Sequence, residues 1–215
     1  MGFNYSVMLD VEDKPVLVVG GGNVAKRKIK DLVALGAKVR VIAPIIQEEI
    51  VALEESTNLE CLKRTFSTAD LEQPRPFMVF AATNDVTLNK QITDYCNAKG
   101  ILVNSITEPS EGSLSVQATL RKPQYAVSVS TYGQGPGFSS ALKGYLEHVL
   151  DEKFDLVVQI YIDIRQWLFT VYKDSDVRIQ YLRRLTIENI YSLMNDEELE
   201  YDQLLEKVKE WLSCS

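Results

Sequence analysis

The first feature that could do chemistry is a cluster of glycines, GGGNVA at residues 20–25, which follows an apolar run and fits the pattern G-x-G-x-x-A. In this pattern the first glycine permits a tight turn, the second lets the backbone approach a pyrophosphate, and the final small residue permits close helix–sheet packing. The N-terminus of the following helix offers free N–H groups and a partial positive charge. The pattern predicts a dinucleotide pyrophosphate bound by Gly20, Gly22, Asn23 and Val24; the alternative is a strand–helix turn without a ligand.

The carboxylate that usually holds the adenosine ribose, about 20 residues further on, is absent. The sequence there reads VRVIAP and ends in Ala43 and Pro44. Arg40 could contact the 2′-phosphate of NADP, but its position inside a strand-like run suits a solvated or sheet-edge arginine at least as well. The ribose is therefore expected to be held by other groups or by backbone near Ala43 and Pro44.

A second polar group follows another apolar run, in AATND at residues 81–85. Ligands of open α/β sheets bind at the carboxyl ends of the strands, so Thr83 and Asn84 are candidates to contact ribose or adenine. The alternative is that Thr83, Asn84 or Asp85 caps a helix starting near Val86, and both functions are compatible. Asn104 ends the next apolar run and is expected at the same edge.

The elements that would position these groups alternate between strand-like and helix-like. Short apolar runs predict strands at residues 16–19, 38–42, 59–63, 77–82 and 101–104, and helical spacing predicts helices at 23–35, 47–56 and 86–98. This alternation with short connections predicts an α/β fold with a Rossmann-like parallel sheet, covered on both faces.

The pattern changes after Asn104. Residues 113–119 and 125–130 are predicted to be strands and 138–150 a helix, followed by helices near 152–172, 175–194 and 197–213. We therefore predict a nucleotide-binding domain at 1–112, a small α+β segment at 113–150 and an all-helical domain at 151–215.

The composition excludes several classes of protein. The net charge is −7, with most of the excess acid after residue 150, which does not suit a basic nucleic-acid-binding surface. There is neither a long apolar run that predicts a membrane span nor a secretory signal. The three cysteines suggest neither a disulfide framework nor a metal clip, which favours a reducing cytoplasm. His148, the only histidine, is predicted to lie at a surface or interface, and no cluster suggests a resident metal.

Several segments together resemble the precorrin-2 dehydrogenase family, which includes the siroheme-synthase-type dehydrogenases. The resemblance lies in residues 18–28, 36–44, 81–85 with Asn89, 103–104 and 127–131, and covers about residues 8–150. It implies NAD-dependent oxidation of precorrin-2 to sirohydrochlorin, and in some members also insertion of ferrous iron. It further implies a homodimer with an intertwined middle region, and it favours NAD over NADP because a second strand ending in apolar-Pro is typical of the family.

Two departures from the family pattern concern the chemistry. Many members carry an aspartate three or four residues after the asparagine of the fifth strand, whereas this chain has Thr107 and Glu108. Glu108 is the candidate proton acceptor, and a solvated loop glutamate is the alternative. The other departure is SLSV at residues 113–116. The resemblance gives a bifunctional dehydrogenase–ferrochelatase as one alternative, which these changes weaken. The same changes favour the other alternative, a non-catalytic NAD(H)-sensing module.

The substrate that the resemblance implies is a polycarboxylate tetrapyrrole, which needs local cations and hydroxyls. The candidates for its binding are Ser113, Arg121, Ser128, Ser130 and Thr131, with Lys122 beside them. The alternative for RKP at residues 121–123 is an ordinary hairpin turn. The aromatic residues of the C-terminal helices are expected to form a helical core or a dimer surface rather than a lid.

Overall fold

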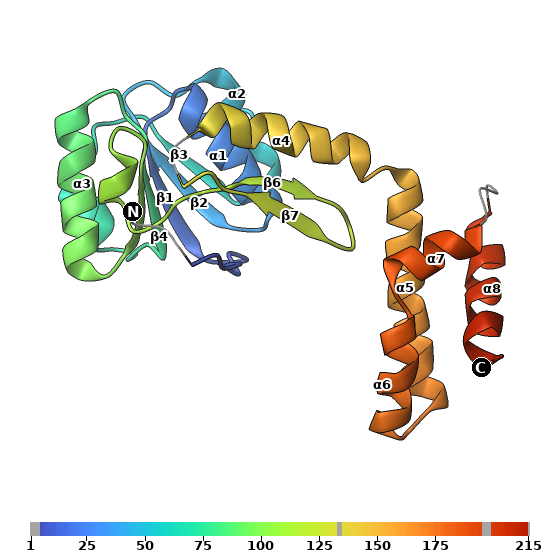
Figure 1. Ribbon diagram of the computed structural model, residues 1–215. Coiled ribbons are helices and arrows are strands. Elements are labelled where there is room, and N and C mark those ends of the chain that lie inside the picture. The colour runs from blue at the N-terminus through green and yellow to red at the C-terminus, as the bar shows by residue number, and fades with distance from the viewer. Residues whose placement is uncertain (1–4, 133–134, 195–198, 215) are drawn as a thin grey trace. The chain divides into compact units, whose positions relative to one another are not determined.

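The computed structural model describes residues 5–132, 135–194 and 199–214, and the chain divides into two compact units (Figure 1). One unit is formed mainly by the chain up to Val116, and the other by Gln117–Thr131 together with the chain from Gly135 onward. The three-domain division suggested by the sequence stays a prediction.

The first unit is built on a five-stranded sheet, which confirms the predicted Rossmann-like fold. Its strands are β1 (Pro15–Val19), β2 (Lys38–Ile42), β3 (Leu59–Leu62), β4 (Met78–Ala81) and β5 (Leu102–Ser105). All neighbouring strands pair in parallel, in the order β3-β2-β1-β4-β5. From β1 the chain adds β2 and β3 on one side of that strand and then β4 and β5 on its other side. The space between β1 and β4 is therefore the switch point of the sheet.

Alternation along the strands sends side chains to two apolar layers. In β1, Val16 and Val18 pack with helix α1 (Asn23–Ala34) and the short helix α2 (Glu48–Val51) on one face. Leu17 and Val19 pack into the other layer with helix α3 (Val86–Lys99). Figure 1 shows α1 and α3 flanking the sheet in this way.

Two predicted elements, one from each unit, depart most from their expected bounds. The predicted helix at 47–56 is α2 followed by a separate 3₁₀ turn η1 (Glu54–Ser56). The Ala52 N–H still donates to the carbonyl four residues back, at Glu48, whereas the Leu53 N–H donates to the carbonyl three residues back, at Ile50, which is the 3₁₀ pattern. The predicted strand at 113–119 starts only at Ala118, since its first residues instead run beside β5. The other short 3₁₀ turns are η2 (Thr68–Leu71) and η3 (Pro109–Glu111).

In its described residues, the second unit contains a two-stranded antiparallel hairpin and five helices. Strands β6 (Ala118–Arg121) and β7 (Ala126–Val129) contact helix α4 (Pro136–Val149). The helices that follow are α5 (Glu152–Val171), α6 (Ser175–Arg184), α7 (Ile187–Met194) and α8 (Tyr201–Ser213). Their apolar faces form one core, which includes Ile160, Ile164 and Leu204, so the predicted helical C-terminal region is confirmed.

The predicted single helix at 175–194 is wrong, because the chain breaks at Leu185 and Thr186. The Thr186 hydroxyl oxygen accepts a hydrogen bond from Asn189 N–H, and the Asn189 amide donates to the carbonyl of Arg184. Thr186 thereby caps a new helix, as threonine does at helix N-termini. The predicted start of the last helix at 197 lies outside the described residues. In the part of the chain that the structure describes, no helix has the length and apolarity to cross a bilayer.

Candidate functional site

The carboxyl ends of four strands bring most of the sequence-predicted site residues to one edge of the sheet. Val19 pairs with both Ile42 and Ala81, and Ala81 pairs with Ser105, so the loops after β1, β2, β4 and β5 begin side by side. This is the edge where open α/β sheets bind ligands, at the switch point between β1 and β4.

The three glycines after β1 meet different demands. Gly20 has φ +125°, and a Cβ there would lie 2.2 Å from the carbonyl oxygen of Ala82. A Cβ on Gly21 would lie 2.4 Å from the carbonyl oxygen of Ile45. Around Gly22, in contrast, no atom of the described residues lies within 4 Å of the position of a Cβ, apart from Gly22 itself and its two chain neighbours. The fold itself therefore requires the first two glycines, whereas Gly22 keeps open a space that the protein does not fill.

The start of α1 is equipped for an anion. Gly22 is its N-cap, with no side-chain cap and no acidic residue in the first turn, so the first N–H groups keep their bonding capacity. Asn23 and the 41%-exposed Val24 form the first helical residues. The dipole and the free N–H groups of a helix N-terminus bind phosphate well. These residues fit the pyrophosphate of a dinucleotide.

The loop after β2 carries no carboxylate. Ala43 is buried, Pro44 is exposed, and Ile45 is 84% exposed. Gln47, which sequence reasoning missed, fastens this loop to the glycine turn: its backbone N–H donates to the carbonyl of Gly21 over 3.1 Å. Its side-chain Nε2 donates to Oδ1 of Asn23 over 3.0 Å. No spacing rule singles out this glutamine, because the contact depends on how two loops meet.

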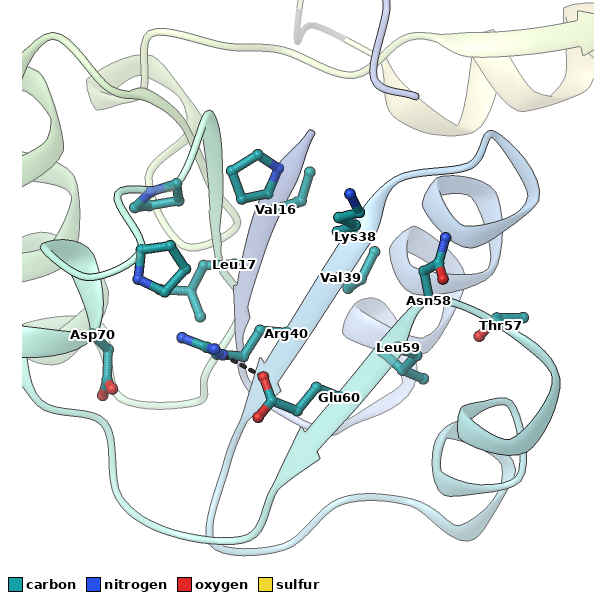
Figure 2. Close-up of a pocket in the computed structure, with 13 residues that line it drawn as sticks. Val16, Leu17, Lys38, Val39, Arg40, Thr57, Asn58, Leu59, Glu60 and Asp70 are labelled. Atoms are coloured by element: carbon teal, nitrogen blue, oxygen red, sulfur yellow. Dashed lines mark hydrogen bonds and ion pairs between the residues drawn. The ribbon is translucent and has the colours of Figure 1, made fainter. Parts of the chain in front are cut away.

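Arg40 lies away from this edge. Its Nε donates to Glu60 Oε2 over 2.6 Å, across the pairing of β2 with β3, as Figure 2 shows. The structure therefore favours an arginine on the sheet face over one that contacts a 2′-phosphate.

A cavity of about 520 Å³ lies beside Arg40. Figure 2 shows the residues that line it. Lys38 and Arg40 face it together with Glu60 and Asp70, and hydrogen bonding from Arg64 holds the pKa of the Asp70 carboxyl below its usual value. Its lining residues come mainly from β1, β2 and β3 and lie toward the amino ends of these strands. The cavity therefore does not coincide with the glycine-turn edge.

The loop after β4 is held by Asn89, which is fully buried on α3. The Thr83 hydroxyl donates to Asn89 Oδ1 over 2.7 Å, and Asn89 Nδ2 donates back to the Thr83 carbonyl over 2.9 Å. Asn89 Nδ2 also reaches the hydroxyl of Thr107, in the loop after β5, at 3.4 Å. Asp85 caps α3 by accepting from Leu88 N–H, so the capping alternative holds for Asp85. Asn84 is exposed at the edge.

Two residues of the β5 region were proposed for the chemistry. Asn104 Nδ2 donates to the carbonyl of Leu114 over 2.9 Å, so its amide fastens the chain that follows. Glu108 lies exposed three residues after β5, at the same edge as the glycine turn. The Ser110 hydroxyl donates to Glu108 Oε1 over 2.7 Å, and Glu108 N–H donates to the buried Ser105.

The residues proposed for the substrate fall in both units. In the first unit, the Ser113 hydroxyl oxygen accepts from Val103 N–H over 3.0 Å, on the free edge of β5. In the second unit, Arg121, Ser128 and Ser130 are exposed and Thr131 is half-buried. Ser128 pairs with Thr119 across the hairpin, and Thr131 lies 3.1 Å from Ser139 and accepts from Gly135 N–H.

The hairpin turn of the second unit has a structural role that the sequence did not suggest. Lys122 Nζ lies 2.6 Å from Asp155 of α5, and the Tyr125 hydroxyl donates to the same carboxylate over 2.8 Å. Burial and this hydrogen bond raise the pKa of Tyr125 to about 12. Burial opposes ionisation of Asp155, but the bonds from Lys122 and Tyr125 outweigh it and lower its pKa.

The remaining candidate ligands are dispersed. His148 is exposed near the end of α4, as expected for a surface residue. The cysteines are free, with Cys96 buried and Cys214 exposed. Over residues 5–132, 135–194 and 199–214, no group of three or more His, Cys, Asp or Glu side chains is placed to hold a metal ion.

Known proteins share this architecture. A family model described as putative NAD(P)-binding matches residues 7–118. The precorrin-2 dehydrogenase of Priestia megaterium is 29% identical over 205 residues, covering 95% of this chain and 100% of that protein. The siroheme synthase of Zymomonas mobilis is 32% identical over 151 residues, covering 70% of this chain and 32% of that protein. A solved structure titled "SirC, precorrin-2 dehydrogenase" matches with a TM-score of 0.77 and 27% identity, over 96% of this chain and 100% of that chain.

The two kinds of relative differ in length. The chain spans the full length of the precorrin-2 dehydrogenase but less than half the length of the siroheme synthases that it matches.

Proposed function

This chain belongs to the putative NAD(P)-binding family represented by the precorrin-2 dehydrogenases and siroheme synthases, and from that premise we propose that it oxidises precorrin-2 to sirohydrochlorin with NAD. The observation that carries the proposal is the glycine turn at the switch point. There the uncapped start of α1 and the open space at Gly22 suit a dinucleotide pyrophosphate.

The proposed roles of the cofactor-binding residues follow from their positions. The backbone at Gly20, Gly22, Asn23 and Val24 holds the pyrophosphate. The loops after β2 and β4 flank the adenosine, with backbone at Ala43 and Pro44 on one side and Thr83 and Asn84 on the other. Because Asn89 engages the Thr83 hydroxyl, Asn84 is the better placed of the two side chains to contact the cofactor. Asn104 supports the same edge from β5.

The reaction needs a hydride acceptor, which bound NAD supplies, and a place for the proton. We propose Glu108 as the proton acceptor, because it is the carboxylate that follows β5 directly and Ser110 orients it. The carboxylates of the substrate are proposed to meet Arg121 and the hydroxyls of Ser113, Ser128, Ser130 and Thr131. Lys122 is left out of this proposal, because its ammonium group pairs with Asp155.

The direct test supplies purified protein with freshly prepared precorrin-2 and NAD and measures NADH and sirohydrochlorin together. We expect both products to appear in equal amounts. NAD binding without turnover would instead identify a nucleotide-sensing module. Sirohydrochlorin with ferrous or cobalt ion tests metal insertion. A rate above that of the protein-free control would identify a bifunctional dehydrogenase–ferrochelatase.

Glu108 is tested by Glu108→Gln, with Glu111→Gln as the matched control. Glu111 lies three residues further on and pairs with Lys90 at 3.4 Å. This ion pair holds η3 against α3, and Glu111 is assigned no role in the reaction. We expect Glu108→Gln to lower turnover roughly 10²-fold, as loss of a general base does, with NAD affinity unchanged. Equal turnover in the two variants would remove Glu108 from the mechanism.

We further infer a homodimer located in the cytoplasm. Helix α4 leaves apolar side chains exposed at Phe138, Tyr145 and Val149, with exposures of 64%, 64% and 48%. These residues recur along one side of the helix and suit burial against a second copy. The free cysteines agree with a reducing compartment. Light scattering after size-exclusion chromatography tests the dimer, and a monomer at micromolar concentration would contradict it.

A further inference from the structure

We propose that Gln47 is a positioning residue for the dinucleotide, which acts by orienting the side-chain amide of Asn23 toward the pyrophosphate. The inference rests on the proposed binding of NAD at the glycine turn. It identifies a residue outside the glycine pattern, on a different loop, that sets how well that turn binds its ligand.

The geometry ties Gln47 to the turn at two points. Its backbone N–H donates to the carbonyl of Gly21 over 3.1 Å, and its Nε2 donates to Oδ1 of Asn23 over 3.0 Å. The loop before it lies so close that a Cβ on Gly21 would meet the Ile45 carbonyl oxygen at 2.4 Å. Gln47 therefore couples the loop after β2 to the first residue of α1.

The direction of the side-chain bond determines what Asn23 offers to a ligand. A primary amide has one oxygen that accepts and one NH₂ group that donates. With Oδ1 turned to Gln47, the NH₂ group of Asn23 is turned away from it, at a helix N-terminus whose N–H groups are free. An added donor at this position strengthens binding of a phosphate oxygen, since bonds to ionised acceptors are the stronger ones.

A second observation argues that Gln47 is not there for stability. Its Oε1 is buried and has no hydrogen-bond partner, the one side-chain atom in this condition among the described residues. An unsatisfied buried acceptor destabilises the folded chain. A methionine of similar length would remove that oxygen and keep the packing, so the glutamine is explained by the contact that its Nε2 makes.

The experiment measures two quantities for each variant: NAD dissociation constants by calorimetry, and the Tm without NAD. For Gln47→Met we expect a Tm equal to or above that of wild type and a Kd for NAD raised about tenfold. Gln91→Met is the matched control, because Gln91 is exposed on α3. In an Asn23→Ala background, Gln47→Met is expected to raise the Kd no further.

Gln47→Glu tests the orientation itself. A carboxylate can only accept, so it would turn the Asn23 amide round and present Oδ1 to the phosphates. We expect a Kd raised at least as much as in Gln47→Met. An unchanged Kd would show that Asn23 donates to residue 47, and the inference would be wrong.

The outcomes separate the two proposals. Wild-type protein that does not bind NAD would overturn the proposed function. Wild-type protein that binds NAD, with Gln47→Met binding it equally well, would overturn only the role of Gln47. A Gln47→Met variant with a lower Tm and an unchanged Kd would assign Gln47 a structural role and also overturn the inference.

Discussion

The contrast between Gly20 and Gly22 gives the sharpest expectation, because the same substitution should act on different properties at the two positions. In Gly20→Ala the residue must hold φ +125°, and the new Cβ meets a backbone oxygen at 2.2 Å. An L-residue in a left-handed conformation costs about 1–2 kcal/mol, and overpacking adds about 1–3 kcal/mol. The free energy of unfolding should therefore fall by roughly 2–5 kcal/mol.

Gly22→Ala should leave the fold intact. Gly22 has φ −95° and ψ −168°, an extended conformation open to alanine, and apart from its two chain neighbours no described residue comes within 4 Å of the new Cβ. Stability should change by less than about 1 kcal/mol, because the restriction of the unfolded chain by alanine offsets its poorer propensity for the N-cap position. The methyl group would instead occupy the space assigned to the pyrophosphate. We expect the Kd for NAD to rise at least about tenfold, or about 1.4 kcal/mol.

Urea unfolding and NAD calorimetry on both variants make the test. The assignment would be supported if Gly20→Ala lowers the free energy of unfolding and Gly22→Ala lowers the NAD affinity without lowering the free energy of unfolding. If Gly22→Ala binds NAD as tightly as wild type, the open space is not where the pyrophosphate lies. If Gly20→Ala is as stable as wild type, the close approach of the glycine turn to β4 is not a constraint on the fold.

Three further expectations follow from other contacts. Asn89→Ala should lower the free energy of unfolding, measured in urea, by about 2 kcal/mol, because the partners of Asn89 in two loops lose their hydrogen bonds. Asn84 is exposed, so Asn84→Ala should weaken NAD binding and leave stability unchanged. The reverse pattern would contradict both roles. Asp155→Asn should cost about 1 kcal/mol at pH 7. The folded-state pKa of Asp155 lies below its ordinary value of 3.8, so its contribution to stability is present above pH 3.8 and is lost as the pH falls through the folded-state pKa. In urea titrations, the free energies of unfolding of wild type and variant should therefore converge at that low pH. A difference between them that is equal at all pH values would exclude the carboxylate as the cause. Arg40→Met should leave the ratio of the Kd values for NAD and NADP, measured by calorimetry, unchanged, because Arg40 pairs with Glu60 away from the carboxyl edge of the sheet. A changed ratio would indicate that Arg40 contacts the cofactor.

Local sequence signals determined most of the first unit. Apolar runs of four or five residues bounded by glycine or proline can be buried as parallel strands, and the 3.6-residue spacing after them suits helices, so the order of strands and helices followed from the chain alone. The glycine pattern placed the ligand-binding turn for the same reason: its backbone conformations are intrinsic to the residues. The break at Thr186 was missed because a threonine within helical spacing caps a new helix only where the chain turns there.

The tertiary structure decided what each residue of that turn is for. Nothing in GGGNVA distinguishes a glycine required by a neighbouring carbonyl from one that leaves space open, because the Ala82 and Ile45 oxygens come from other loops. The sequence offered Arg40 as a possible phosphate contact, and only strand pairing placed it beside Glu60. Gln47 and Asn89 act through hydrogen bonds to residues 24 and 6 positions away, which no periodicity encodes. The sequence alone thus determined the class of fold and the kind of ligand, while the contacts between loops decided how the site is held.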